Sequence, residues 1–97
     1  MPIKPELIWD YGAVDDLSKI REFIEPHNKK AALNAAQRII KSVNLLLDNP
    51  YLGRPLEDIP EFNEFFIPFG QRGYVMRYRV ENKKIIILRI WHCREDR

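Results

Sequence analysis

Cysteine is nearly absent from this chain of 97 residues, which contains Cys93 and no other thiol. A single thiol excludes a framework of internal disulfides. Histidine is also scarce, and His27 and His92 together with the one cysteine cannot complete a four-ligand zinc site unless carboxylates contribute. The sequence therefore predicts a protein without a bound metal, and it contains no motif that requires a cofactor.

Long apolar runs are missing as well. No stretch approaches the roughly 18 apolar residues of a membrane-spanning helix, and residues 1–12 lack the apolar segment of a secretory signal peptide. These two absences predict a cytoplasmic protein with no membrane contact. A glycine-rich phosphate loop is also missing, because Gly70 and Gly73 flank a predicted turn and match neither the G-x-G-x-x-G nor the P-loop pattern.

The charges are distributed unevenly along the chain. The net charge is +2, but residues 1–69 carry a net charge of −3 and residues 70–97 carry +5. Positive charge concentrated at one end favours an anionic partner, either a nucleic acid or an acidic protein segment. The competing interpretation is an ordinary solvated surface whose charges happen to be unevenly placed.

The strongest local pattern is a β-hairpin in the last quarter of the chain. Residues 74–80 (YVMRYRV) and 85–92 (IIILRIWH) are rich in β-branched and aromatic side chains, and polar residues separate the two runs. Arg89 interrupts an apolar run, so it must reach solvent or pair with a carboxylate, because a buried unpaired charge is costly. A loop centred on Asn82 and Lys83 predicts five strand pairs: Val80–Ile85, Tyr78–Ile87, Arg77–Leu88, Val75–Ile90 and Tyr74–Trp91.

Helical periodicity dominates the first half of the chain. The spacing of apolar residues predicts a helix over residues 13–25, which Pro26 ends. Asn28 can cap a second helix that runs to Asp48. Its apolar stripe consists of Ala32, Ala35, Ala36, Ile39, Ile40, Val43, Leu46 and Leu47.

Short strands are predicted at residues 6–9 and 64–69, and a loop over residues 51–61. The order of elements is then β-α-α-β-β-β. It predicts one α+β domain over residues 1–97, in which an antiparallel two-helix hairpin packs on an antiparallel sheet.

No nucleophilic catalytic system is apparent in the sequence. His92 and Cys93 are adjacent on a predicted strand, so their side chains point to opposite faces. Cleavage of RNA by general acid–base catalysis would need a base, an acid and cations around the phosphate. The side chains available for it are Arg72, Tyr74, Arg77, Tyr78, Arg79, Arg89, His92 and Arg94. Core packing is the competing role for the tyrosines, and a solvated sheet face is the competing role for Arg77 and Arg79.

Four motifs occur in an order and spacing that resemble one known family. Residues 13–24 resemble the pattern A-x-x-D-L-x-x-I, and residues 49–59 resemble N-P-x-x-G-R-x-L. Residues 74–80 resemble Y-V-x-x-Y-R-V, and residues 90–94 resemble a closing I-x-H-x-R. Together they make the whole chain similar to the RelE/ParE superfamily of toxins from bacterial toxin–antitoxin modules.

The resemblance implies two alternative targets. RelE-like members cut messenger RNA in the ribosomal A site, whereas ParE-like members share the fold and inhibit DNA gyrase. Nuclease members have an arginine where this chain has Val75, and they use lysines or a glutamate in the region of residues 57–69, which here contains no lysine. The ParE-like interpretation is therefore favoured. A ribosome-dependent endoribonuclease is the alternative, with His92, Arg94 and Arg72 as its catalytic candidates.

The resemblance also implies a cognate antitoxin, ParD-like or RelB-like, that wraps across the helices and the sheet to form a hetero-oligomer. The predicted antitoxin contacts are Arg77, Arg79, Ile39, Val43 and Leu46, with the arginines meeting antitoxin carboxylates. The predicted contacts with the target are Arg89, His92, Arg94 and Arg97. A degenerate member that only binds its antitoxin is a third interpretation.

Overall fold

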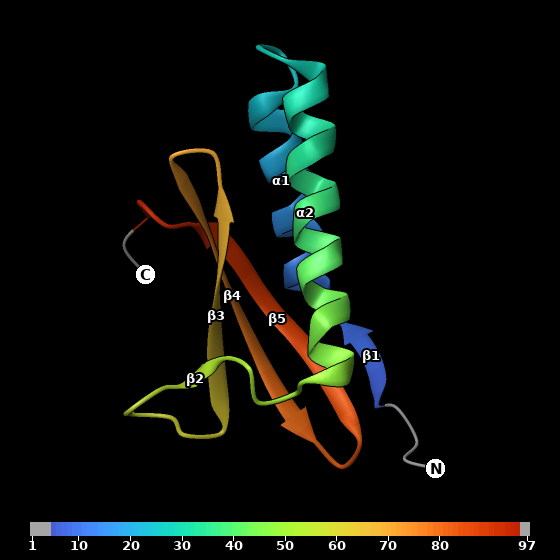
Figure 1. The fold of residues 1–97 in the computed structure, drawn as a ribbon, viewed down its shortest axis with the longest axis vertical. Helices are drawn as coiled ribbons and strands as arrows, with labels where there is room; N and C mark the ends of the chain where they lie inside the picture. Colours follow the sequence, from blue (N-terminus) through green and yellow to red (C-terminus); the bar gives the residue numbers. More distant parts are fainter. Residues whose placement is uncertain (1–4, 96–97) are drawn as a thin grey trace.

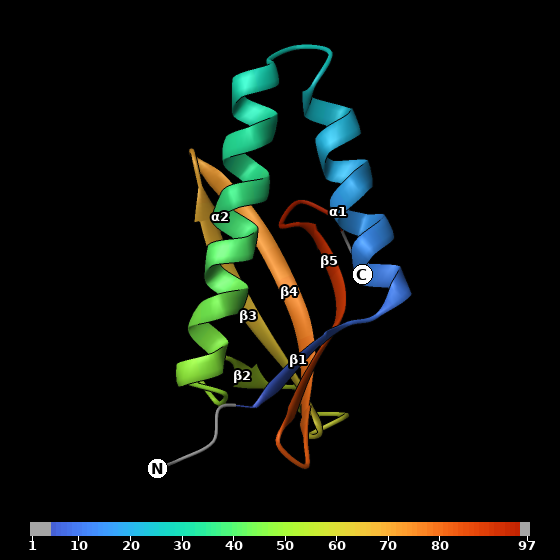
Figure 2. The ribbon, with the colours of Figure 1, turned by 90° about the vertical axis from the view of Figure 1, so that its right-hand side faces the viewer.

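Two antiparallel helices lie on one face of a five-stranded sheet in the computed structural model, which describes residues 5–95 (Figure 1). The view in Figure 2 shows the helices side by side, joined at the end furthest from the N-terminus. No helix in this described part is long and apolar enough to cross a membrane. The elements are β1 (Glu6–Trp9), α1 (Tyr11–Ile24), α2 (Lys29–Asp48), β2 (Arg54–Pro55), β3 (Phe62–Phe69), β4 (Arg72–Glu81) and β5 (Lys84–His92).

The strands are arranged in the order β1-β5-β4-β3-β2. Strand β1 runs parallel to β5, whereas the β5–β4, β4–β3 and β3–β2 pairs are antiparallel. The predicted α+β class and element order are confirmed, and the sheet is mixed because of β1. The short strand β2 lies in the stretch predicted as a loop, where it pairs with the first half of β3.

Capping side chains set the starts of both helices. The carboxylate of Asp10 accepts a hydrogen bond from the Gly12 backbone N–H at 3.4 Å, so α1 begins two residues before the predicted start. The side chain of Asn28 accepts one from the Ala31 N–H at 3.0 Å and caps α2 as predicted. The short link around Pro26 keeps the helices next to each other.

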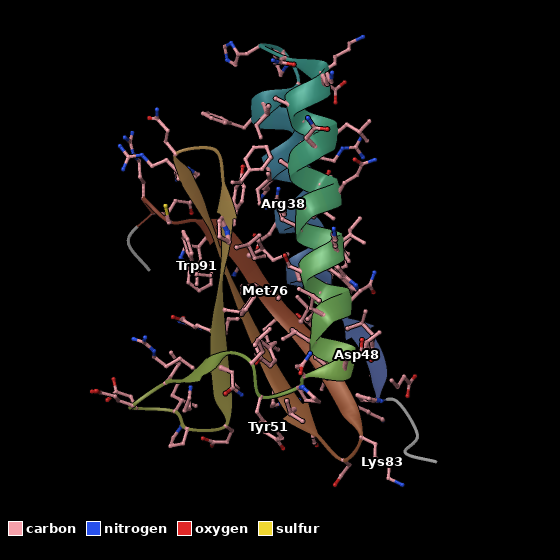
Figure 3. The ribbon with its side chains drawn as sticks, in the orientation of Figure 1. Arg38, Asp48, Tyr51, Met76, Lys83 and Trp91 are labelled. Carbon is pink, nitrogen blue, oxygen red and sulfur yellow. The ribbon has the colours of Figure 1, made fainter. Side chains whose placement is uncertain are left out.

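The core lies between α2, α1 and the helix-facing side of the sheet. Met76, labelled in Figure 3, is fully buried there. Arg38 links α2 to β3, since its Nη1 donates a hydrogen bond to the Pro68 carbonyl at 3.3 Å. The buried hydrophobic cluster consists of Ala13, Ala35, Ile39, Val43, Leu46, Ile67, Tyr74, Met76, Tyr78, Ile85, Ile87 and Ile90.

The turn between β4 and β5 is the predicted one. Asn82 and Lys83 have φ angles of +43° and +63°, and two consecutive positive φ values are typical of the two-residue type I′ hairpin turn. Of the five predicted pairs, the two nearest this turn, Val80 with Ile85 and Tyr78 with Ile87, are observed.

Beyond Tyr78 the predicted hairpin register is wrong by one residue, because the pairing shifts between Arg77 and Tyr78. Leu88 has no partner on β4, as expected of the extra residue in a β-bulge. The bulge reverses the sides of the residues that follow, so Ile90 enters the core and Trp91 lies on the opposite face. The observed pairs are Arg77–Arg89, Met76–Ile90, Val75–Trp91 and Tyr74–His92, in place of Arg77–Leu88, Val75–Ile90 and Tyr74–Trp91.

Candidate functional site

Arg77 lies on the sheet face turned away from the helices, which we call the open face. A carboxylate on the neighbouring strand β3 balances its charge. Its Nε and Nη2 atoms donate hydrogen bonds to Glu64 Oε2 at 3.1 and 2.7 Å. The guanidinium carbon lies 5.1 Å from the centre of the Trp91 ring, a cation–π distance. Because Glu64 is directly opposite Arg77 in the β3–β4 register, the pairing follows from the sheet itself.

Arg79, two residues further along the same face, is also paired. Its Nη2 lies 3.1 Å from Glu81 Oε2. Its Nε is buried and has no hydrogen-bond partner within residues 5–95. Both arginines predicted to meet antitoxin carboxylates therefore already have a carboxylate from the chain itself.

An apolar strip crosses the same face beside these ion pairs. Phe66 on β3 pairs with Val75 on β4, and Val75 pairs with Trp91 on β5. Phe66 is half exposed and Trp91 is largely buried. The face therefore presents aromatic and aliphatic surface flanked by neutralised arginines, with Val75 at its centre.

Arg89 forms a bidentate ion pair with a buried carboxylate of α1. Its Nε and Nη2 donate hydrogen bonds to Asp16 Oδ2 and Oδ1 at 2.7 and 3.0 Å, and the Ile90 N–H donates to Asp16 Oδ2 at 2.9 Å. Asp16 is 5% exposed, while the Arg89 side chain is 47% exposed. The hydrogen bond to Asp16 raises the pKa of Arg89. The prediction that Arg89 must reach solvent or find a carboxylate is confirmed, and the pair ties α1 to the bulge in β5.

Two of the other predicted target contacts, His92 and Arg94, lie at the end of β5. Nδ1 of His92 accepts a hydrogen bond from the Arg94 N–H at 3.1 Å, and the Cys93 N–H donates to the Gly73 carbonyl at 3.0 Å. This second bond places the end of β5 beside Arg72, which begins β4. Arg72 and Arg94 are exposed. Three of the nuclease candidates, Arg72, His92 and Arg94, thus lie at one end of the sheet, and Arg97 lies outside the described residues.

Tyr74 lies against this end but is buried. Its ring meets the His92 ring edge-on, with the ring centroids 5.5 Å apart. Burial, with a smaller contribution from Cys93, raises the pKa of Tyr74 above its ordinary value of 10.0. The phenol therefore stays protonated near neutral pH and is unsuited to act as a general base.

The structure places Ile39, Val43 and Leu46, which were predicted to contact an antitoxin, inside the core. All three side chains are fully buried in the core. The apolar stripe that suggested them is the side of α2 that packs on the sheet, so it has no surface left for a partner. The exposed apolar side chains of α2 are Leu33, Ile40 and Leu45.

The motif over residues 49–59 has a structural role that the sequence did not reveal. The Gly53 N–H donates a hydrogen bond to the buried Tyr78 hydroxyl at 2.8 Å. A Cβ atom at Gly53 would lie 2.6 Å from that oxygen and 2.8 Å from the Glu64 carbonyl, so only glycine fits. The loop between α2 and β3 is thereby held against the sheet.

Tyr78 predicts a specific alkaline response. Burial is the main reason that its pKa is raised above 10.0. The folded protein then binds more protons than the unfolded chain above about pH 10, so the free energy of unfolding should fall there as pH rises and be unaffected below it. We expect Tyr78→Phe to flatten this fall in urea denaturation between about pH 9 and 11. The exposed Tyr11→Phe is the control, and an unchanged slope in Tyr78→Phe would contradict the assignment.

The described residues contain no group of three or more His, Cys, Asp or Glu side chains placed to hold a metal ion. The charged side chains of the open face instead pair with one another across and along the strands. The arrangement is suited to binding another macromolecule through an apolar strip, and two exposed cations, Arg72 and Arg94, lie near the end of β5.

Comparisons with known proteins are consistent with one another. Residues 7–97 match the model of a family described as the ParE toxin of the type II toxin–antitoxin system parDE. Two relatives come from Caulobacter vibrioides. Toxin RelE1 is 30% identical over 82 residues, which cover 84% of this chain and 86% of the relative. Toxin RelE3 is 33% identical over 82 residues, which cover 84% of this chain and 87% of the relative.

Solved structures give the same fold. The chromosomal ParDE toxin–antitoxin system from P. aeruginosa contains a chain that is 29% identical, with a TM-score of 0.75 over 92% of this chain and 96% of that one. The RelBE2 toxin–antitoxin complex from Mycobacterium tuberculosis is 20% identical, with a TM-score of 0.63 over 93% and 99%. A mutant of the E. coli toxin RelE in the free state is 14% identical, with a TM-score of 0.64 over 91% and 82%. At these identities the last two support the fold alone.

Proposed function

Since this chain belongs to the ParE toxin family of type II toxin–antitoxin systems, we propose that it arrests growth by inhibiting DNA gyrase and not by cutting messenger RNA. A cognate antitoxin would neutralise it in a hetero-oligomeric complex. Only the target is a matter of proposal, because the chain is similar both to relatives with RelE names and to a chain of a ParDE system.

The composition of the open sheet face is the observation that carries this proposal. An RNA-cutting site needs cations free to stabilise the charge that develops on the phosphate. Here Arg77 is held by Glu64 and Arg79 by Glu81, and Val75 stands where nuclease members have an arginine. The face is better suited to contact an apolar protein surface than to activate a phosphodiester.

The exposed end of β5 is the proposed site of contact with gyrase. His92 and Arg94 lie there, and Arg97 follows in the sequence. Arg89, the fourth predicted contact, is engaged by Asp16, so we assign it the role of positioning β5 against α1. Gyrase acts on DNA, and a cationic end next to bound DNA would strengthen binding through its phosphates.

The antitoxin is proposed to cover two surfaces. One is the exposed side of α2 that carries Leu33 and Ile40, which lie two turns apart on the helix. The other is the open sheet face, where antitoxin carboxylates could compete with Glu64 and Glu81 for the two arginines. Both surfaces lie in the described part of the chain and require no unfolding of the core.

A supercoiling assay with purified gyrase tests the proposal. Added toxin should block supercoiling and accumulate linear, protein-linked DNA, and prior addition of the cognate antitoxin should prevent both effects. No effect on gyrase at a large molar excess of folded toxin would contradict the proposal.

A ribosome-dependent endoribonuclease is the second candidate, because Arg72, His92 and Arg94 lie at one end of the sheet. It predicts that the double replacement His92→Ala and Arg94→Ala lowers the rate of ribosome-dependent cleavage by at least about 100-fold, which is typical for loss of acid–base catalysis. The proposed gyrase inhibitor predicts instead no transcript cleavage by the unaltered chain. Messenger RNA cut at ribosome-occupied codons would favour the nuclease.

A further inference from the structure

A cavity of about 340 Å³ lies beneath the loop that joins α2 to β3. Its position is near the β4–β5 turn, and Tyr51 and Lys83 mark this end of the molecule in Figure 3. His92 and Arg94 are at the other end of β5, so the cavity is separate from the surface proposed to contact gyrase. The lining residues are Tyr51, Gly53, Pro55, Pro60, Glu61, Asn63 and Val80.

Asn63 is the unusual member of the lining. Its side chain is only 7% exposed, and its amide makes no hydrogen bond to any part of the chain that the structure describes. Among residues 5–95, the completely buried side-chain polar atom that has no partner is Arg79 Nε. The unpaired amide atoms of Asn63 are therefore still accessible from the cavity. Buried polar groups are nearly always hydrogen-bonded. A cavity wall with an unpaired amide is therefore arranged to receive a polar ligand.

The other lining residues restrict the chemistry of that ligand. Glu61 is the charged side chain of the lining, so the cavity wall offers a carboxylate that can pair with a cationic group. The Tyr51 ring is 76% exposed and can lie against a flat cationic group. Two prolines and Val80 supply apolar contact for an aliphatic stem.

We propose that this cavity binds an arginine side chain on an extended segment of a protein partner. A guanidinium can donate to the Glu61 carboxylate and to the Asn63 carbonyl oxygen at once, and it stacks on an aromatic ring better than an ammonium does. The cavity is at the small end of ligand pockets, which span about 300–1,000 Å³, and so suits one side chain. The proposal is independent of whether the toxin acts on gyrase.

The loop that forms the cavity is held in place before any ligand binds. The Gly53 N–H is bonded to the Tyr78 hydroxyl, and the Leu56 N–H donates to the Phe62 carbonyl at 2.9 Å. A pre-formed site loses less conformational entropy on binding than a loop that must first become ordered.

An NMR titration of the ¹⁵N-labelled full chain tests the proposal. The probe is acetyl-Gly-Arg-Gly-amide, and the neutral isostere with citrulline in place of arginine is the matched control. We expect saturable shifts of the Asn63 side-chain NH₂ and Gly53 backbone signals, with a Kd on the order of 1 mM for so small a probe. Absence of saturable shifts, or equal shifts with the citrulline peptide, would overturn the proposal.

Variants of exposed residues complete the test without disturbing the core. Tyr51→Ala and Glu61→Gln should each weaken arginine binding about 5-fold or more. Tyr11→Ala, on α1, and Glu57→Gln, outside the cavity lining, should leave the affinity unchanged. Equal losses in the control variants, or equal affinity for the corresponding lysine peptide, would show only general attraction of cations to an acidic loop and would reject the arginine site.

Discussion

Asp16→Ala is expected to lower the free energy of unfolding by about 2–4 kcal/mol. The replacement removes three hydrogen bonds at once, two from Arg89 and one from the Ile90 N–H. It leaves a buried backbone N–H unpaired at the bulge and separates α1 from β5. Urea denaturation at neutral pH measures the change, and hydrogen exchange of the Ile90 amide should become faster.

The neighbouring Asp15→Ala is the matched control. Asp15 forms an exposed ion pair with Lys19 at 2.9 Å within one turn of the same helix. Such surface pairs contribute less than about 1 kcal/mol. If Asp16→Ala were as stable as Asp15→Ala, the Asp16–Arg89 pair would not hold the helix to the sheet.

Ile39→Ala is expected to lower the free energy of unfolding by about 2–5 kcal/mol, because it opens a cavity between α2 and the sheet. The adjacent Ile40→Ala should change stability by less than about 0.5 kcal/mol, since Ile40 is largely outside the core and alanine is a better helix former. Thermal or urea unfolding of the two variants measures the difference.

The same pair of variants distinguishes core residues from partner contacts on α2. Affinity for the purified cognate antitoxin should fall in Ile40→Ala while its stability stays near that of the unaltered chain. Equal stability losses in the two variants would contradict the observed orientation of α2, and unchanged antitoxin affinity in Ile40→Ala would remove this side of α2 from the proposed antitoxin surface.

Local signals in the sequence were sufficient for most elements. Pro26 follows the end of α1, and Asn28 caps the start of α2. Asn82 and Lys83 adopt the turn that the polar loop predicts. The hairpin register beyond Tyr78 could not be predicted in the same way. The bulge there is held by Asp16, which is 74 residues away from Ile90 in the sequence, and no local pattern reports a contact of that kind.

The candidate site was predictable only in part. The sequence showed that Arg89 had to reach solvent or pair with a carboxylate, but several acidic residues could have supplied the carboxylate, and only the packing of α1 selects Asp16. The apolar stripe with Ile39 was assigned to a partner because periodicity identifies a buried side without identifying what covers it. Asn63 gave no signal at all, since an asparagine in a strand becomes notable only when its surroundings leave it unpaired.

Growth arrest in cells that express the chain without an antitoxin offers the most direct test of the gyrase proposal. DNA-linked gyrase and newly formed 5′ ends of messenger RNA can be mapped in the same culture. The proposal predicts that gyrase–DNA complexes accumulate while the transcript ends remain those of untreated cells. Transcript cleavage at ribosome-occupied codons, with no rise in gyrase–DNA complexes, would contradict it.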